Sequence, residues 1–472
     1  MSDAVPLVVD VDGTLVRGDL LHEAALQFVA RHPLQAWRLL AWLARGKAAL
    51  KSELAARVDP GSDSVPLRDE TIAAIREARA EGRPVVLASA SHRRWVEPIA
   101  GRVGATDVMA TDAAVNLAGR NKAEALVRRF GRGGFDYIGD QPIDLPVWDA
   151  ARLPLLVAHR RGLEAVVHRR FANARTIVRE RRTLRPYLRA LRPHQWAKNL
   201  LVFLPVVAGH AFLDPARLAA ASLAFLAFCS AASSAYIIND LLDLPGDRDH
   251  PRKRNRPFAS GQATPVAGLA LASALMALSL CLAASLPWRF VVVLCAYVAL
   301  TLGYSLVLKR RLLIDVIVLG GLYTIRVLGG VTATGQVQSQ WLLMFSLFLF
   351  LSLATVKRCS ELVARREAGK PPPLGRGYVV GDLAVLFPLA SAAGYGAALV
   401  VALYLSSPEV ARLYAHPGRL WLVCPVLLYW ISRVLVICNR DELHDDPVIF
   451  ALTDRISWLC GVLVAAVIGV SI

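Results

Sequence analysis

The chain has 472 residues, of which 55% are hydrophobic and 19% are charged, and its mean hydropathy is +0.44. A composition this apolar excludes a disordered chain and an ordinary soluble protein. The formal net charge of +17 could indicate a nucleic-acid binder, but residues 160–198 alone hold 12 Lys/Arg against two Glu, directly before the most apolar part of the chain. Because anionic lipid headgroups attract such a segment, we expect a membrane protein without a nucleic-acid partner.

The first 158 residues have the pattern of an α/β domain. Short β-rich runs alternate with helical stretches; the runs are PLVVDVDGT, RPVVLASAS, GATDVMATD, FDYIGD and LPLLVA, and one long helical segment is expected over residues 22–57. Strands that alternate with helices predict a parallel sheet flanked by helices. Five of the first 20 residues are charged where a cleavable signal peptide would be apolar, so we expect this domain, residues 1–158, to stay in the cytoplasm.

The remaining sequence is a basic segment followed by a long apolar region. Residues 159–197 predict a linker with an interfacial helix, and residues 198–472 predict an all-α bundle of membrane-spanning helices. Nine stretches are candidate spans, at about residues 200–213, 218–238, 266–286, 290–308, 312–335, 341–356, 383–407, 420–438 and 456–472. The first and the sixth are short for a full crossing.

The charges of the loops orient these spans. One set of alternate loops, at residues 241–263, 309–311, 357–382 and 439–455, holds 16 Lys/Arg, whereas the other set holds only Arg217, Arg289, Arg412 and Arg419. Cytoplasmic loops carry the excess of positive charge. We therefore expect a multi-pass protein of the inner (plasma) membrane, with a cytoplasmic N-terminal domain and an external C-terminus.

The first β-rich run ends in a pair of acids, in the sequence Asp10-Val11-Asp12-Gly13-Thr14. Ligands bind at the carboxyl ends of parallel strands, and two carboxylates at i and i+2 can face one pocket if the chain turns there, as Gly13 permits. One carboxylate then suits a nucleophile and its neighbour a general acid/base. The alternative is a turn with two solvated acids.

Three further polar groups follow in order. Ser89 ends the next apolar strand, Lys122 begins a helix, and Asp140 and Asp144 follow another strand. Ser91 is an alternative to Ser89, and Asp144 is alternatively the N-cap of a helix.

Together with the first acid pair, these groups resemble the haloacid dehalogenase-like hydrolases over roughly residues 5–158. The resemblance implies a Rossmann-like fold whose helical cap is the segment near residues 22–57. It also implies a phosphatase in which Asp10 forms an aspartyl-phosphate and Asp12 is the acid/base. The implied phosphate-binding residues are Ser89 and Lys122, and the implied Mg²⁺ site is formed by Asp10, Asp12, Asp140 and Asp144.

A second group of acids stands at the end of the second apolar stretch. The candidate metal ligands are Asn239, Asp240, Asp243 and Asp247, and the candidate phosphate-binding residues that follow are Arg252, Lys253, Arg254 and Arg256. On one continuous helix the four candidate ligands would lie near one face, where like charges are costly unless a cation neutralises them. A Mg²⁺-bound diphosphate is such a ligand. A solvated loop is the alternative, and Pro245-Gly246 predicts a bend before Asp247.

The order N-D-x-x-D-x-x-x-D resembles the aspartate-rich motif of the UbiA superfamily of intramembrane prenyltransferases, and the resemblance covers about residues 185–472. The second D-x-x-x-D motif of that superfamily is not present in that form. In its place the sequence offers other candidate site residues, namely Tyr304, Lys309, Asp315, Arg326, Lys357, Arg358 and Glu361. Asp315 and Arg326 are separated by about 16 Å along a helix with a rise of 1.5 Å per residue, so we expect no direct pair; Asp315 is a candidate metal or ribose contact.

Three segments resemble one branch of that superfamily, the decaprenyl-phosphate phosphoribosyltransferases. They are RPHQWAKN at residues 192–199, HPRKRNRP at residues 250–257 and KRCSEL at residues 357–362. The resemblance implies Mg²⁺-dependent transfer of 5-phosphoribosyl from phosphoribosyl diphosphate (PRPP) to a polyprenyl phosphate such as decaprenyl phosphate. Lys198, Lys309, Lys357 and Arg358 are then further phosphate-binding residues.

The sequence thus predicts an enzyme of two steps, in which the N-terminal domain removes the 5-phosphate from the lipid product. One alternative is a UbiA-type prenyltransferase that joins a polyprenyl diphosphate to an aromatic acceptor and carries an independent phosphatase domain. The other is a transporter or lipid-flipping protein with a regulatory domain. Two separate acid clusters of the Mg²⁺ type argue against this last class, since transport of an uncharged solute needs neither.

Overall fold

The structure is a computed structural model, and it describes residues 4–112, 116–159, 161–180, 183–367, 369, 377–443 and 446–472. Residues 160, 181 and 182 of the predicted basic segment lie outside this part. The chain forms two compact units, Met1–Leu191 with Tyr236–Ala272, and Arg192–Ala235 with Ser273–Ile472. The first unit therefore holds the predicted α/β domain together with the predicted aspartate-rich segment.

The first unit is built on a six-stranded parallel sheet in the order β3-β2-β1-β4-β5-β6. Its strands are β1 (Leu7–Val9), β2 (Val85–His92), β3 (Asp107–Thr111), β4 (Asp136–Gly139), β5 (Leu153–Ala158) and β6 (Arg175–Arg179). The strand order reverses at β1, which pairs with β2 on one side and with β4 on the other. Ligands bind at such a switch point, outside the carboxyl ends of the strands, so the fold places the residues after β1 at the expected ligand site.

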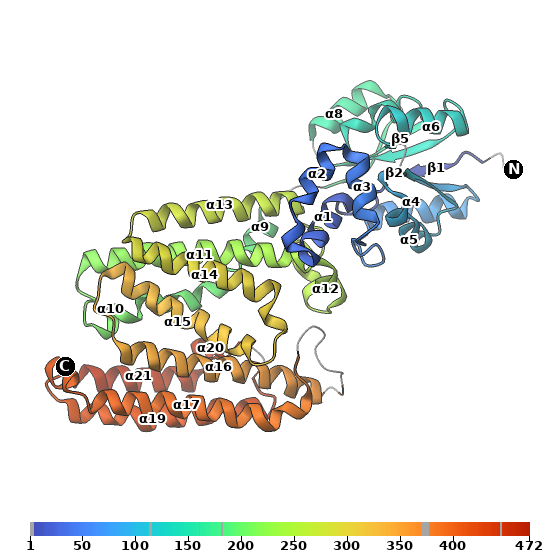
Figure 1. Cartoon of the computed structure of the whole chain (residues 1–472). Helices are drawn as coiled ribbons and strands as arrows, with labels where there is room; N and C mark the ends of the chain where they lie inside the picture. Colours follow the sequence, from blue (N-terminus) through green and yellow to red (C-terminus); the bar gives the residue numbers. More distant parts are fainter. Residues whose placement is uncertain are drawn as a thin grey trace. The chain divides into compact units, whose positions relative to one another are not determined.

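Helices cover both faces of this sheet (Figure 1). Leu7 and Val9 of β1 lie in one hydrophobic cluster, and Val8 between them lies in another, because side chains of a strand alternate between its faces. The first cluster includes residues of α4 (Asp69–Ala80) and α5 (Arg93–Val103), and the second includes residues of α6 (Arg120–Phe130), α7 (Leu145–Trp148) and α8 (Arg161–Arg170). The predicted α/β domain is confirmed.

The predicted helical segment between β1 and β2 is present, and it is divided into several helices. The insert contains α1 (Leu20–Arg31), α2 (Arg38–Ala44) and α3 (Lys47–Ala55). Pro33 begins a separate 3₁₀ turn after α1, since proline has no N–H to continue the helix. Gly46 precedes α3 with a φ of 109°, a backbone conformation that favours glycine.

The sheet also continues into the segment predicted to be a linker. Residues 159–197 contain α8, the sixth strand β6 and α9 (Arg185–Ala190), and β6 pairs with β5. The strand Arg175-Thr176-Ile177-Val178-Arg179 has only three uncharged residues between two arginines. Its high charge therefore concealed a strand at the edge of the sheet.

The remaining helices include the candidate membrane spans. Seven are long and apolar enough to cross a bilayer: α11 (Pro215–Leu242), α13 (Pro265–Ala284), α14 (Trp288–Leu306), α15 (Ile314–Thr334), α16 (Gln340–Glu367), α17 (Leu383–Leu405) with the 3₁₀ turn before it, and α19 (Val423–Asn439) with the 3₁₀ turn before it. Large apolar side chains such as Leu269, Val292 and Leu399 are at least half exposed on these helices. Apolar side chains exposed on several long helices need an apolar surrounding, so this is a multi-pass membrane protein.

The predicted number of nine spans differs from what the structure contains. Its described residues hold seven such helices, or eight if α20 (Pro447–Thr453) and α21 (Arg455–Gly469), which are bent by 76° relative to each other, form one span. The first predicted span is not a regular helix: it consists of the 3₁₀ helix Pro193–Phe203 followed by the short α10 (Leu204–Ala208), because Pro205 and Gly209 interrupt a regular helix there. The sixth stretch is not short, since α16 extends it to 28 residues.

The residue ranges that make up the first unit predict on which side of the membrane the N-terminus lies. Residues 1–191 and the loop after α11 belong to one compact unit, so they lie on the same side of the membrane. The chain between them contains the span α11, so the 3₁₀ helix Pro193–Phe203 and α10 must together pass through the membrane as well. Two crossings by α13 and α14 then return residues 309–311 to the side of the first unit. We expect reporters at residue 1 and at residues 309–311 both to be accessible from the cytoplasm, because these loops are rich in Lys/Arg. Labelling of the two from opposite sides would contradict this topology.

Candidate functional site

The candidate site of the first unit lies at the carboxyl end of β1. Asp10 directly follows that strand, and its backbone N–H donates a hydrogen bond of 3.0 Å to Ile138 O of β4. Asp140 follows β4, and Asp144 belongs to the 3₁₀ turn Pro142–Asp144. The switch point of the sheet thus brings together acids that are 130 or more residues apart in the sequence.

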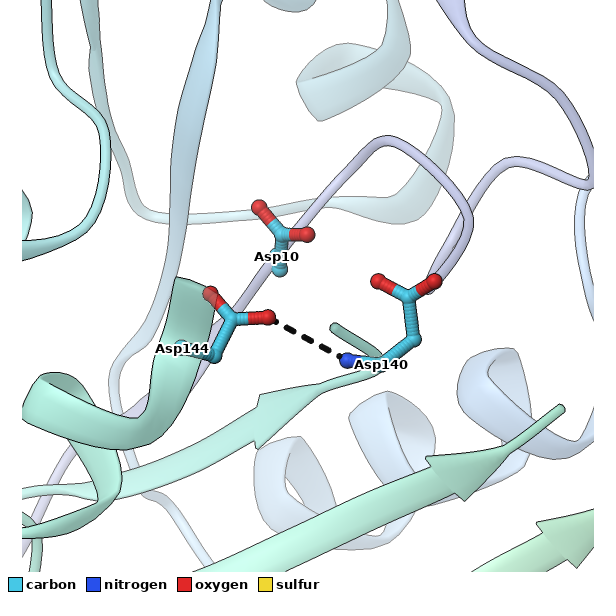
Figure 2. Close-up of side chains that lie close together, drawn as sticks. All are labelled: Asp10, Asp140 and Asp144. Atoms are coloured by element: carbon cyan, nitrogen blue, oxygen red, sulfur yellow. Dashed lines mark hydrogen bonds between the residues drawn. The ribbon is translucent and has the colours of Figure 1, made fainter. Parts of the chain in front are cut away.

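Asp10, Asp140 and Asp144 form a tight group of carboxylates, drawn in Figure 2. One ligand oxygen from each lies within 4.8 Å of those of the other two, and all three residues are buried. Asp144 Oδ2 accepts the backbone N–H of Asp140 at 3.3 Å and that of Gln141 at 3.2 Å, so its cap-like role and its place in the cluster coexist. Three converging carboxylates form the oxygen set that a hard divalent cation such as Mg²⁺ prefers.

Lys122 balances part of this negative charge. Its ammonium donates to Asp10 Oδ1 at 2.7 Å and to the Tyr137 hydroxyl at 3.0 Å, and it lies 3.6 Å from Asp144 Oδ1. Burial raises the pKa of Asp10 well above its ordinary value, while Lys122 opposes that rise. Burial alone would lower the pKa of Lys122, but the Asp10 and Asp144 carboxylates outweigh it and raise that pKa, so Lys122 stays charged.

Asp12 faces a different set of groups. Its Oδ1 accepts the N–H of Leu20 at 2.8 Å, and its Oδ2 accepts the hydroxyls of Ser89 at 3.1 Å and Ser91 at 2.7 Å. The Asp12 carboxylate is not part of the three-carboxylate group, so the structure does not place it as predicted among the metal ligands. Burial raises the pKa of Asp12 to about 6, which suits a group that donates and accepts a proton near neutral pH.

Two positions explain why the local sequence is D-x-D-G-T. Gly13 has a φ of +78°, and a Cβ there would lie 2.3 Å from Asp140 Oδ2, so both the turn and the close approach of Asp140 require glycine. Thr14 donates to Asp140 Oδ1 at 3.0 Å and lies 3.5 Å from Asp10 Oδ2. The motif therefore supplies the two acids and also supports the third.

The aspartate-rich segment is bent in the way that Pro245-Gly246 predicts. Helix α11 ends at Leu242, and the short α12 (Leu244–Asp249) begins after Asp243. Asp240 and Asp247 are both buried, and one nitrogen of Arg256, Nη1, lies 3.1 Å from Asp240 Oδ1 and 2.6 Å from Asp247 Oδ2. The four candidate ligands therefore do not lie on one continuous helix, and a guanidinium lies between two of them.

The other candidates of this segment are more exposed. Asn239 and Asp243 are half-buried, whereas Arg252, Lys253 and Arg254 are exposed. Within the residues that the structure describes, Asp240, Asp243 and Asp247 do not form a three-carboxylate group like the one around Asp10. The predicted metal site is thus not assembled here in the form expected from the sequence.

Helix α12 is also held by the insert of the α/β domain, within the same unit. Arg248 donates from Nη1 and Nη2 to the two carboxylate oxygens of Glu23 on α1, both at 2.8 Å. The two side chains are only 4% and 3% exposed. Gln27, one turn further along α1, donates to Leu242 O at 3.3 Å. Helix α1 begins beside Asp12, because the N–H of Leu20 is the donor to that carboxylate.

The second unit gathers cations around Asp446, at the N-cap of α20. Asp446 Oδ2 accepts Lys198 Nζ at 2.8 Å and Lys357 Nζ at 2.7 Å. Arg326 lies nearby on α15, where its Nε donates to Asn199 Oδ1 at 2.8 Å and its Nη2 to Tyr297 OH at 3.0 Å. Lys198, Lys357 and Arg326 were predicted as site residues; Asp446, which joins two of them, was not.

Arg358 is the centre of another buried network in that unit. Its Nε lies 2.6 Å from Asp315 Oδ2, its Nη2 donates to Tyr304 OH at 2.8 Å, and its Nη1 bonds both oxygens of Glu361 at 2.9 and 2.8 Å. Asp315 thus pairs with Arg358 and not with Arg326, in agreement with the predicted separation. In this network two carboxylates surround one guanidinium, so the cation has more than enough negative charge around it. Lys309 is half-buried in a 3₁₀ turn after α14.

Comparison with known sequences identifies both parts of the chain. Residues 202–468 match the UbiA prenyltransferase family, and residues 40–149 match the haloacid dehalogenase-like hydrolases. The protein y4nM of Sinorhizobium fredii is 35% identical over 465 residues, which are 98% of this chain and 90% of that protein. This chain belongs to the UbiA prenyltransferase family. It carries a haloacid dehalogenase-like domain at its N-terminus.

Two further proteins match a smaller part of this chain. The decaprenyl-phosphate phosphoribosyltransferase of Mycolicibacterium smegmatis is 38% identical over 186 residues, which are 39% of this chain and 58% of that protein. A solved UbiA homologue from Archaeoglobus fulgidus, bound to GPP and Mg²⁺, is 20% identical and covers 60% of this chain and 99% of that one, with a TM-score of 0.47. UbiA prenyltransferases and haloacid dehalogenase-like hydrolases generally use Mg²⁺, and the Asp10, Asp140 and Asp144 oxygens fit such an ion.

The sequence missed several groups around the haloacid dehalogenase-like site. His159 Nε2 lies 3.0 Å from Gly13 O and 3.4 Å from Asp140 Oδ2, and its Nδ1 lies 3.1 Å from Glu180 Oε2. Although burial opposes protonation, these partners raise the pKa of His159 to about 9. Lys51 of the cap donates to Asn116 Oδ1 at 2.9 Å. His159 directly follows β5, a strand that was predicted, so the rule that applied to Asp10 could have found it. Glu180 directly follows β6, which was not predicted.

Proposed function

We propose that this UbiA-family protein transfers 5-phosphoribosyl from PRPP to a polyprenyl phosphate, and that its N-terminal domain then removes the 5-phosphate from the lipid product. The observation that carries the proposal is the phosphate-handling arrangement of Asp10, Lys122 and the neighbouring acids on the same chain as the transferase. The product of ribosyl transfer still carries a phosphate monoester, which is the class of bond that an aspartate nucleophile of this kind can cleave.

In the transfer step, an oxygen of the lipid phosphate attacks C1 of the ribosyl group as the bond from C1 to the diphosphate breaks. The products are polyprenyl phosphoryl 5-phosphoribose and diphosphate. The residues proposed to hold the diphosphate are Asp240, Asp243 and Asp247, with Asn239 beside them. Since Arg256 lies between Asp240 and Asp247, diphosphate and its cation would have to displace this guanidinium, which is then free to contact the phosphate.

In the hydrolysis step, Asp10 attacks the phosphorus and the ribosyl oxygen leaves with a proton from Asp12. Water then attacks the aspartyl-phosphate while Asp12 takes its proton, and inorganic phosphate is released. Lys122 and Ser89 are proposed to contact the phosphate oxygens, and Lys122 also opposes the rise in the pKa of Asp10 that burial causes. A bound Mg²⁺ would lower the repulsion between the Asp10 carboxylate and the phosphate.

PRPP is a soluble, highly charged molecule, so both sites are proposed to face the cytoplasm from the inner (plasma) membrane. The experiment that tests the proposal incubates the full chain, in detergent with Mg²⁺, with labelled PRPP and decaprenyl phosphate, followed by mass analysis of the lipid. We expect a ribosylated lipid without a 5-phosphate, together with one diphosphate and one phosphate per product.

The competing prenyltransferase function predicts a different outcome of the same assay. A polyprenyl diphosphate with an aromatic acceptor would then release diphosphate, whereas PRPP with decaprenyl phosphate would not. Decaprenol, which lacks the phosphate that attacks, is the matched control for the lipid. Product formation from decaprenol as readily as from decaprenyl phosphate would exclude the proposed acceptor chemistry.

A further inference from the structure

The cluster of Lys198, Lys357, Arg326 and Asp446, here called the Asp446 cluster, has no role fixed by the steps above. Its members come from four segments of the second unit: the 3₁₀ helix Pro193–Phe203, α16, α15 and the start of α20. Lys198 and Arg326 are 7% and 5% exposed, and the Lys357 side chain is 30% exposed. Long-range packing thus concentrates cations at one place in the bundle.

The charges in the Asp446 cluster do not balance among the described residues. Lys198 and Lys357 share one oxygen of one carboxylate, and the side-chain partners of Arg326 are the neutral Asn199 and Tyr297. Within the part of the chain that the structure describes, three cations therefore face one anion. The aromatic ring of Tyr323 lies 5.7 Å from both Lys198 Nζ and the Arg326 guanidinium carbon, which offsets only part of the repulsion.

Buried cations of like sign are costly without a second anion. The contrast with the network around Arg358 is direct, because that guanidinium contacts both Asp315 and Glu361. Each lysine ammonium has three N–H donors, of which the bond to Asp446 uses one. The cluster thus has surplus positive charge and surplus donors, and a group with two negative charges and several acceptor oxygens would satisfy both.

We propose that the Asp446 cluster is a binding site for a phosphate monoester, in which Asp446 holds the two ammonium groups together before the ligand arrives. The inference rests on the proposed function, which supplies two sources of a phosphate monoester. They are the headgroup of the polyprenyl phosphate and the 5-phosphate of PRPP. Lys198 and Lys357 bind the phosphate directly, and Asp446 is a positioning residue.

The lysine variants and the Asp446 variant are expected to change the affinity for phosphate in opposite directions, because they remove charges of opposite sign. Lys198→Gln or Lys357→Gln removes attraction for the phosphate, and we expect its Kd to rise at least about tenfold, as for the loss of one charge-assisted hydrogen bond. Asp446→Asn removes a competing anion, while the asparagine Oδ1 can still accept hydrogen bonds from the lysines and cap α20, so this variant should bind phosphate at least as tightly as the wild type. A purely structural cluster would instead weaken binding in all three variants.

The test measures binding to the full chain in phosphatidylcholine nanodiscs. Ribose 5-phosphate against ribose tests the donor as source, and decaprenyl phosphate against decaprenol tests the acceptor. Arg289→Gln, which removes an exposed positive charge of the same unit, is the matched control. We expect the lysine variants to lose the preference for the phosphorylated partner in one pair and to keep it in the other, and Arg289→Gln to keep both.

Unchanged preferences in both lysine variants would overturn the proposal, as would weaker phosphate binding in Asp446→Asn. Lys198→Arg keeps the charge and should keep binding if Lys198→Gln fails to fold, and Lys357 is exposed enough to be replaced alone. Because these are binding measurements, they separate the two ideas. Phosphate-dependent binding without any ribosylated lipid would refute only the proposed function, whereas ribosylation with unchanged binding in the lysine variants would refute only this site.

Discussion

Asp10→Asn is expected to reduce phosphate release from the lipid at least about a thousandfold, the scale of losing a catalytic nucleophile, while PRPP consumption continues. Asparagine cannot attack phosphorus, and it removes the charge that Lys122 contacts at 2.7 Å. The lipid that carries both ribose and 5-phosphate should therefore accumulate. The measurement is mass analysis of the lipid fraction together with inorganic phosphate over time.

The control for that variant is Asp69→Asn, a carboxylate of the same unit whose side chain is 90% exposed. It should leave both reactions unchanged. Undiminished phosphate release by Asp10→Asn would refute the role of Asp10. A wild-type protein that makes the 5-phosphorylated lipid and never dephosphorylates it would refute the coupling of the two reactions, even with both domains correctly assigned.

Asp240→Asn and Asp243→Asn are expected to lower ribosyl transfer at least about a hundredfold, since each removes a charged ligand oxygen from the proposed diphosphate site. The bend before α12 alone predicts a smaller loss for Asp247→Asn. However, Asp247 shares the Arg256 guanidinium with Asp240 and is equally buried, so we expect a comparable loss.

The second active site provides the internal control for these variants. When the 5-phosphorylated lipid is supplied directly, its hydrolysis should be normal in all three, which shows that the chain is folded. Transfer that persists in Asp240→Asn with its Mg²⁺ dependence intact would remove the aspartate-rich segment from the mechanism.

The sequence predicted those site residues that stand directly at the ends of recognisable strands. Asp10, Asp140 and Ser89 stand at the ends of apolar β-rich runs, and a parallel sheet brings such ends together whatever the loops between them. Groups supplied by the cap and by the edge of the sheet were missed. Lys51 lies in α3, a separate helix that begins after Gly46, and Glu180 follows a strand that its arginines concealed.

The membrane region was predictable in composition but less so in geometry. Apolar runs located α11 and α13 to α17, since lipid exposure makes their hydrophobicity nearly continuous. The stretch at residues 200–213 has the same composition, but Pro205 divides it between a 3₁₀ helix and a short α-helix. Asp446 carried no sequence signal, because its importance comes from two lysines that lie 248 and 89 residues away.

The buried pair of Glu23 and Arg248 determines how the protein can be divided. A truncated chain without residues 1–191 would leave Arg248 without its carboxylate, one position after Asp247. Loss of one partner of a buried ion pair costs about 3–5 kcal/mol, and the released guanidinium would compete with Arg256 for the nearby acids. A minimal transferase made by deleting the N-terminal domain should therefore be unstable and inhibited. Supplying residues 1–191 as a separate polypeptide would return Glu23 and restore activity in trans.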